Sequence, residues 1–239
     1  MAIKITKATE ITSELSTFLI YANPGVGKTT AIKYFPGKKL VIDIDKSSTV
    51  LKVEPDIDVA EINTHNIWEE WTELVADILK NPNNYAEYDN IVIDNISELF
   101  RATLANLGRL GNNNRVPAQA DYQRVDFTIL DSLRALKGIG KRIIFTAWET
   151  TDQYYTPGGQ VFNRAIPDMR MKILNNFLGL CDVVARLVVH TDEDGNEKRG
   201  FILQPSETVY AKNRLSDAKG ARVDELYTKT AGVVSGEEG

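Results

Sequence analysis

The stretch that decides the fold is "ANPGVGKTT", residues 22–30, which directly follows the apolar run "STFLIY". Gly25 and Gly27 allow backbone conformations in which successive N–H groups point inward and form an anion-binding turn. A helix that begins at such a turn adds the positive end of its dipole. Lys28 would then reach the β- and γ-phosphates of a nucleotide, and the Thr29 hydroxyl would be a ligand of Mg²⁺. The stretch therefore predicts a P-loop, whose nucleotide-binding residues are Asn23, Pro24, Gly25, Val26, Gly27, Lys28, Thr29 and Thr30.

The strict P-loop pattern has glycine where this chain has Ala22, and the remainder of the pattern is intact. The alternative interpretation is an ordinary turn between a strand and a helix, with a threonine as the cap. The context favours the P-loop, because an apolar run precedes the turn and two later apolar runs, residues 39–45 and 89–95, end in polar or acidic residues.

The composition limits the possible functions. A chain of 239 residues with 43% hydrophobic content can form one sizeable α/β domain. A net charge of −5 argues against a protein that coats nucleic acid through bulk positive charge, so any contact with DNA must be local. Cys181 is the single cysteine, which excludes a disulfide framework and a cysteine-based zinc site. No apolar run approaches the roughly 18 residues of a membrane span, so we expect a cytoplasmic protein without a membrane partner.

Strands and helices alternate along the chain. Short apolar runs predict strands at residues 16–22, 39–45, 89–95 and 141–149, and helical spacing predicts helices at 66–79, around 125–136 and at 169–182. Residues 182–205 contain two β runs around an Asp-Gly pair, which is typical of a hairpin. The pattern predicts a three-layer α/β fold with a mostly parallel sheet and an antiparallel C-terminal hairpin.

Two stretches, residues 107–120 and 150–168, carry Gly, Pro, Asn and Gln without periodicity, so we expect long loops there. We expect an N-terminal segment at residues 1–14, one ATPase core at 15–232 and a flexible acidic tail at 233–239.

Carboxylates at the predicted strand ends supply the rest of a nucleotide site. Asp94 ends "NIVID", where it would hold Mg²⁺ through water. AAA-type ATPases usually carry a glutamate directly after this aspartate, but here the residue is Asn95. The base that activates water must then come from another strand end, and Asp45 is the first candidate and Glu149 the second. Asp43 shares a strand face with Asp45, and both could instead only cap the following helix.

The order of these parts resembles the RecA-like ATPase core. It is most similar to the short, core-only RecA relatives of bacteriophages known as phage nucleotide-binding proteins, among them Sak-type single-strand annealing proteins. The resemblance covers about residues 15–216 and is carried by "ANPGVGKTT", "LVIDID", "YDNIVIDNISEL" and "YAKNRL". It implies a RecA-like fold, ATP as the nucleotide with Mg²⁺, and Asp45 as the catalytic acid.

The stretch "YAKNRL", residues 210–215, matches the place where RecA-like rings and filaments carry a Lys-x-Arg pair. By this resemblance Lys212 and Arg214 would reach the neighbouring subunit's γ-phosphate, so hydrolysis would depend on a homo-oligomer, either a ring or a filament. Two residues that are two apart on a strand point to the same face, as such a pair requires. The alternative is a solvated basic patch.

The resemblance also places single-stranded DNA against the two expected loops. The candidate DNA-binding residues are Arg109, Arg115, Arg164, Arg170 and Lys172, and Tyr154, Tyr155 and Phe162 could stack on bases. The alternative is that these loops are simply polar and mobile. Thr146 and Trp148, in the fourth expected strand, would link the γ-phosphate to the second loop.

The function that these features imply is DNA-dependent ATP hydrolysis in phage recombination or replication, by annealing or strand pairing, in the cytoplasm of an infected bacterium. A phage or host single-strand binding protein would be a further partner. Two other classes stay open. One is an ATP-controlled replication accessory or loader protein that works through a protein partner, and the other is a small-molecule phosphotransferase, whose arginine-rich lid is not evident in the sequence.

Overall fold

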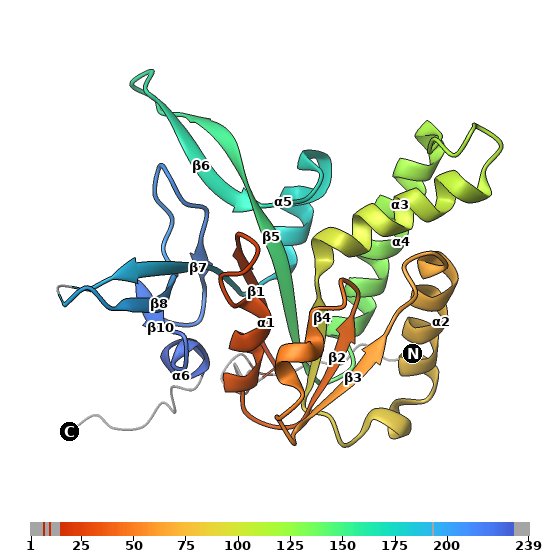
Figure 1. The fold of residues 1–239 in the computed structure, drawn as a ribbon, viewed down its shortest axis with the longest axis horizontal. Coiled ribbons are helices and arrows are strands. Elements are labelled where there is room, and N and C mark those ends of the chain that lie inside the picture. Colours follow the sequence, from red (N-terminus) through yellow and green to blue (C-terminus); the bar gives the residue numbers. More distant parts are fainter. Residues whose placement is uncertain (1–6, 8–9, 11–14, 193, 232–239) are drawn as a thin grey trace.

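The fold is a mixed β-sheet between two layers of helices. A computed structural model describes residues 7, 10, 15–192 and 194–231, and in this part of the chain ten strands join in one sheet. The strands β7, β1, β5, β4, β2 and β3 lie side by side in this order and are parallel (Figure 1). Their bounds are β1 Thr17–Ala22, β2 Lys39–Asp43, β3 Ile57–Glu61, β4 Asn90–Asp94, β5 Arg142–Tyr155 and β7 Val183–Thr191.

Antiparallel strands extend this sheet at two places. At one edge β8 pairs with β7 and β10 pairs with β8, while the short β9 also pairs with β7. In addition, β6 pairs with the distal half of β5. The bounds are β6 Val161–Pro167, β8 Glu197–Ile202, β9 Lys212–Asn213 and β10 Gly220–Arg222.

The central strand β1 is buried on both faces, which explains its continuous run of apolar residues. Leu19 and Tyr21 belong to one core cluster, and Phe18, Ile20 and Ala22 belong to the other. The first cluster contains the apolar faces of α2, α3, α4 and α5, and the second contains residues of α1, η2 and α6. The helix bounds are α1 Lys28–Ala31, η2 Ile32–Tyr34, η3 Ser48–Leu51, α2 Ile67–Lys80, η4 Pro82–Tyr85, α3 Ile96–Leu110, α4 Gln119–Lys137, α5 Met171–Leu180 and α6 Leu226–Thr230.

This architecture confirms the expected three-layer α/β fold with a mostly parallel sheet and an antiparallel C-terminal hairpin. The four strands predicted from apolar runs correspond to β1, β2, β4 and the first half of β5, and the three predicted helices correspond to α2, α4 and α5. The predicted segment 1–14, apart from residues 7 and 10, and the predicted tail 233–239 lie outside the described residues.

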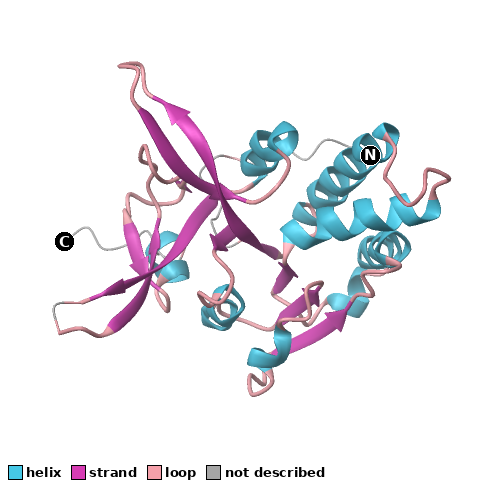
Figure 2. Cartoon of the chain, turned by 45° about the horizontal axis from the view of Figure 1, so that its top comes forward, coloured by secondary structure: helices cyan, strands magenta, loops and turns pink. Residues whose placement is uncertain are grey.

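The expectation of a long loop at residues 150–168 was wrong. This stretch is a β-hairpin, in which β5 continues to Tyr155 and β6 returns from Val161. β-branched and aromatic residues favour strands, and the pair Tyr154 and Phe162 faces across the hairpin. The turn between the strands is closed by two backbone hydrogen bonds of 2.9 Å between Thr156 and residues 159 and 160. The hairpin extends well beyond the rest of the sheet (Figure 1, Figure 2).

The other expected loop, residues 107–120, is shorter than predicted. The helix α3 continues to Leu110 and α4 begins at Gln119, so the irregular part is limited to residues 111–118. The sequence carries a signal for α3 that the prediction did not use. Asn95 accepts a hydrogen bond of 2.8 Å from the backbone N–H of Glu98, and this asparagine is the N-cap of the helix.

Candidate functional site

The P-loop turn lies between β1 and α1, at the carboxyl end of the central strand. Gly25 and Gly27 have φ angles of 80° and 109°, in the left-handed region that favours glycine. The backbone N–H of Ala31 donates to the carbonyl of Gly27 at 3.0 Å and so begins the helix within the turn. The predicted nucleotide-binding residues 23–30 therefore lie together at the edge of the sheet where parallel α/β folds bind ligands.

The Lys28 ammonium lies inside this turn. Its Nζ donates to the carbonyls of Ala22 and Asn23 at 3.0 and 3.1 Å, and the residue is only 7% exposed. Burial lowers the pKa of Lys28, and the carboxylates of Asp94 and Asp45 oppose this shift. A bound phosphate would give the ammonium a stronger acceptor than two neutral carbonyls.

Asp94 is the centre of a cluster of hydroxyl groups. Its Oδ2 accepts hydrogen bonds from Thr29 at 2.7 Å and from Ser47 at 3.2 Å, and its Oδ1 accepts one from Thr146. The residue is 1% exposed, and burial raises the pKa of Asp94 above its ordinary value. The hydroxyl of Thr29 and this carboxylate are hard oxygen donors at one point of the cavity, which is the chemistry that Mg²⁺ prefers. They fit the predicted metal site, in which Mg²⁺ would be held by Thr29 and Asp94.

Asp43 and Asp45, which the sequence places on one strand face, differ in their surroundings. Asp43 accepts hydrogen bonds from the backbone N–H groups of Ser47 and Ser48, each at 3.1 Å, so it caps the turn that follows β2. Asp45 accepts one hydrogen bond at Oδ2, from the Asn95 side chain. Its Oδ1 is buried and has no hydrogen-bond partner among the described residues. The capping alternative therefore holds for Asp43, whereas one oxygen of Asp45 is available for chemistry.

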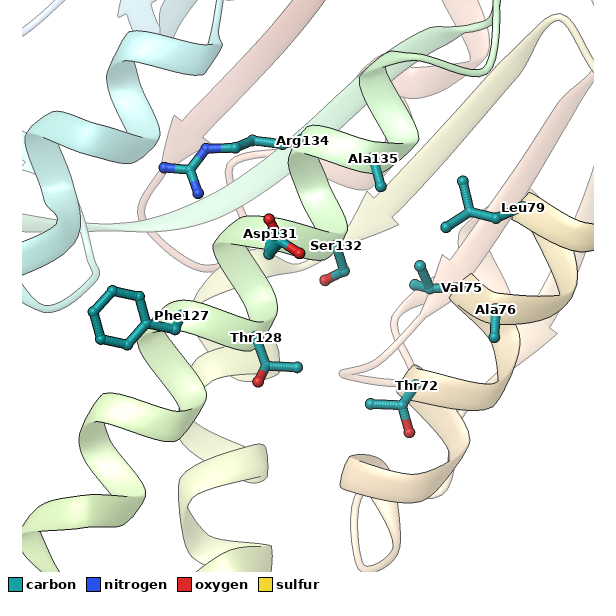
Figure 3. A pocket seen from close by; sticks show the side chains of 10 residues that line it. All are labelled: Thr72, Val75, Ala76, Leu79, Phe127, Thr128, Asp131, Ser132, Arg134 and Ala135. Carbon is teal, nitrogen blue, oxygen red and sulfur yellow. The ribbon is translucent and has the colours of Figure 1, made fainter. Parts of the chain in front are cut away.

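These groups line a cavity of about 310 Å³. Gly25, Gly27, Lys28 and Thr29 meet Asp45, Ser47 and Asp94 there, and Val50 and Trp148 supply its apolar surface. A larger groove of about 480 Å³ lies elsewhere, between α2 and α4, and Figure 3 shows Thr128, Ser132 and Ala135 of α4 on the side that faces α2. No phosphate-binding turn lines that groove, so the P-loop cavity is the candidate site.

Glu149, the second candidate base, lies at the middle of β5. Both of its carboxylate oxygens accept hydrogen bonds from the Arg186 guanidinium, at 2.7 and 2.9 Å. The pair is largely enclosed, with side-chain exposures of 7% for Glu149 and 24% for Arg186. Because the guanidinium donates to both oxygens and stabilises the carboxylate, taking a proton from water would weaken this pair. The geometry favours Asp45 over Glu149.

Lys212 and Arg214 do not share one environment. The Lys212 ammonium donates to the carbonyl of Leu178 at 2.9 Å and to that of Cys181, so it closes the C-terminal end of α5 within its own chain. Burial and the nearby Arg214 lower the pKa of Lys212. The Arg214 side chain is 57% exposed and lies 3.9 Å from Asp182. Lys212 is thus engaged within its own chain and Arg214 is exposed, and the expectation that both residues face a neighbouring subunit stays a prediction.

Some of the predicted DNA-binding residues are engaged within the chain, and others are exposed. Arg109 donates to the carbonyls of Thr64 and His65 at 3.3 and 3.0 Å. Arg170 pairs with Asp126 at 2.6 Å.

Arg164 lies over the Tyr154 ring, with its guanidinium carbon 4.5 Å from the ring centroid. Arg115, in the loop between α3 and α4, and Lys172, in the first turn of α5, are exposed. These two are the cations of the set that are available to a ligand without rearrangement.

Two contacts at the site were not predicted from the sequence. Ser47 joins the Asp94 cluster from the turn after β2. Trp148, expected as a sensor, lines the P-loop cavity, and the Arg101 guanidinium lies 5.0 Å from its ring centroid and pairs with Asp168. A chain of contacts thus connects the cavity with the segment between β6 and α5.

The P-loop turn, the buried aspartate at the end of β4 and the strand β5 between β1 and β4 define a class of protein, the P-loop nucleotide-binding ATPase domains. The chain belongs to the AAA domain family, whose model matches residues 16–215.

Among solved structures the chain is similar to the flagellar accessory protein FlaH from Methanocaldococcus jannaschii. The identity is 12% and the TM-score is 0.41, over 78% of this chain and 76% of that chain. No curated protein sequence matches the chain. Within the described residues, no helix combines the length and the apolar content that crossing a membrane requires.

Proposed function

We propose that the protein hydrolyses ATP with Mg²⁺ and that Asp45 is the general base. The observation that carries this proposal is the free Oδ1 of Asp45, buried in the cavity that also contains Lys28, Thr29 and Asp94. A carboxylate oxygen without a partner can accept a proton from an attacking water, while the amide of Asn95 holds the other oxygen in place. Asn95 thus stands where a catalytic glutamate is usual and orients the base instead.

The remaining residues of the site hold the phosphates. Lys28 exchanges the carbonyls of Ala22 and Asn23 for the β- and γ-phosphates. Thr29 and Asp94 would hold Mg²⁺. When bound, Mg²⁺ offsets the negative charge on the phosphate oxygens.

The active form in this proposal is a homo-oligomer, a ring or a filament. Arg214 contacts the γ-phosphate of the neighbouring subunit and stabilises the charge of the transition state. Its 57% exposed side chain supports this role. Lys212 supports Arg214 indirectly, because it fixes the short strand β9, which directly precedes Arg214, against α5.

The nucleic acid in this proposal is single-stranded DNA, and the process is phage recombination or replication by annealing or strand pairing, with a single-strand binding protein as a further partner. Arg115 and Lys172 would contact phosphates. The hairpin of β5 and β6 presents Tyr155, which is 64% exposed, as a surface on which a base can stack. These features support contact with DNA at a few points and not along a broad basic surface.

One observation favours a second candidate. Arg109 and Arg170, two of the five predicted DNA-binding residues, are engaged within the chain. This loss of two DNA-binding candidates suits an ATP-controlled replication accessory or loader that acts through a protein partner and hydrolyses ATP slowly with little response to DNA.

Steady-state ATP hydrolysis with and without single-stranded DNA separates the two candidates. The first predicts that DNA raises the rate and that Arg214→Ala abolishes the increase, whereas Arg222→Ala, an exposed arginine on the edge strand β10, leaves it intact. A rate that ignores DNA would contradict the recombination proposal and favour the accessory protein.

The contacts with DNA phosphates have a separate test. Arg115→Ala and Lys172→Ala should each lower the slope of log affinity against log salt by about 0.7, the value for one phosphate contact on a single strand. Lys80→Ala, an exposed lysine at the end of α2, serves as the control and should leave the slope unchanged.

A further inference from the structure

An arginine from the C-terminal hairpin stands beside the P-loop of its own chain. A methyl group built on Gly27 would lie 3.8 Å from both Cδ and Nε of Arg199. Gly27 directly precedes Lys28, in the part of a P-loop whose N–H groups face the α- and β-phosphates. No sequence pattern links residues 27 and 199, and only the fold brings them together.

The strand β8 fixes this position of Arg199. Side chains two apart on a strand share a face, so Arg199 and Phe201 point to the same side of the sheet. Phe201 is 3% exposed and lies in the core cluster that contains Ile32, which directly follows α1. In the antiparallel pair of β7 and β8, Arg199 lies opposite Val189. Val189 is three residues beyond Arg186, which lies beside Tyr21 at the end of β1. Arg199 therefore lies on the α1 side of the sheet, at the edge where the P-loop lies.

The charge of the cavity leaves a role for this arginine. Among the residues that the structure describes, the lining contains one cation, Lys28, and two carboxylates, Asp45 and Asp94. A nucleoside triphosphate brings further negative charge to this place. Arg199 is exposed, and its side chain makes no hydrogen bond or ion pair with any other residue that the structure describes. Guanidinium groups bind phosphate with paired N–H donors, so an unengaged arginine beside the turn has the right chemistry for a phosphate ligand.

We propose that Arg199 binds the α- and β-phosphates of the nucleotide held by the same chain. This inference rests on the proposed nucleotide site, but it requires neither DNA nor a second subunit. The proposal gives Arg199 and Arg214 different roles. Arg199 acts in cis and contributes equally to the binding of ADP and ATP, while Arg214 acts in trans on the γ-phosphate. The nucleotide would then tie the hairpin of β7 and β8 to the P-loop.

The test is the affinity for ADP, measured by calorimetry without DNA. Arg199→Ala should weaken ADP and ATP binding by a similar factor of about ten, the size expected for one charge-assisted contact. Arg199→Lys should recover part of the affinity, because it keeps the charge but loses the paired donors. Arg222→Ala is the matched control, since Arg222 is an exposed arginine on the neighbouring strand and pairs with Asp224. It should bind ADP like the wild type.

Two further measurements separate this inference from the function on which it rests. If the wild type binds no ADP, or if Lys28→Ala binds it as well as the wild type, the proposed nucleotide site fails and the inference fails with it. If the wild type binds ADP and Lys28→Ala does not, while Arg199→Ala keeps the full affinity, only the role of Arg199 is refuted. Mixing Arg199→Ala with Lys28→Ala tests the cis geometry, because restored tight binding in the mixture would show that Arg199 acts on a neighbouring subunit.

Discussion

Lys212 stabilises the fold through the end of α5, and replacing it by alanine tests this directly. The side chain donates two hydrogen bonds, to the carbonyls of Leu178 and Cys181. A hydrogen bond from a charged donor contributes about 1.5 kcal/mol or more, so the two bonds together contribute about 3 kcal/mol. Burial of the ammonium and the nearby Arg214 oppose this gain, as the lowered pKa of Lys212 indicates, and we discount about 1 kcal/mol for them. The expected net loss for Lys212→Ala is about 2 kcal/mol.

Urea unfolding, monitored by tryptophan fluorescence, measures this loss. Trp71 is buried in the core, so its fluorescence changes when unfolding exposes the core to water. In a domain of this size the expected fall in melting temperature is about 4 to 8 °C. Lys172→Ala is the matched control on the same helix. Lys172 lies in the first turn of α5, where a positive charge opposes the helix dipole, so its removal should raise the stability by about 0.5 kcal/mol or less.

The result that refutes this reasoning is a Lys212→Ala variant with unchanged stability and no DNA-stimulated hydrolysis. The Lys212 side chain would then not be bound to α5 in solution and would act on the neighbouring subunit, as the Lys-x-Arg resemblance implies. A loss of about 2 kcal/mol with hydrolysis kept in the folded fraction would confirm the structural role and leave Arg214 as the residue that acts in trans.

Three other predictions follow from single residues. Asp45→Asn should lower the rate of ATP hydrolysis by about 100-fold or more at unchanged ATP affinity, because the variant loses the proton acceptor but keeps the volume, and a rate above a tenth of the wild type would exclude Asp45 as the base. Glu149→Gln should cost about 2 kcal/mol in urea unfolding, since it leaves the enclosed Arg186 without its counter-charge, and an unchanged midpoint would show that the pair contributes nothing. Burial raises the pKa of Cys181 from 9.0 to about 12, so the folded state favours the thiol, and this contribution to stability is complete below pH 9 and is lost as the pH rises towards 12. Between pH 8 and 10.5, the free energy of unfolding of the wild type should therefore fall by about 2 kcal/mol more than that of Cys181→Ala. Urea unfolding at the two pH values measures this difference.

The fold was predictable from the sequence where the hydrophobic pattern is strong. The strands β1, β2 and β4 are buried on both faces, so each appears as an unbroken apolar run. The strand β3 lies at the edge of the sheet and is largely exposed, so its sequence gives no such run. The hairpin of β5 and β6 was missed for the opposite reason. Polar residues interrupt its strands because most of it extends away from the core, and cross-strand pairing stabilises it instead of burial.

The P-loop turn of the candidate site was predictable, because a P-loop is a local motif. Asp94 and Asp45 were also predictable, since parallel strands place their carboxyl ends along one edge. The sequence could not show which oxygen of which carboxylate would remain free. Asp43 and Asp45 are two residues apart, yet the first is held by two backbone N–H groups and the second by the side chain of Asn95, 50 positions later.

The role of each cation depends on a partner that is distant in the sequence. Arg109 meets His65 across 44 positions, Arg170 meets Asp126 across 44, and Arg186 meets Glu149 across 37. A count of basic residues in the sequence does not distinguish these arginines from Arg115. In the fold, the N–H groups of these arginines already have acceptors, which they would have to exchange for a phosphate. The gain from such an exchange is small, because one satisfied hydrogen bond replaces another. In the proposed function, the energy for binding single-stranded DNA or a neighbour's nucleotide would therefore come from the cations that the fold leaves exposed. The same reasoning makes Arg109 and Arg170 weaker candidates for DNA binding and supports the proposed role of Arg199 in nucleotide binding.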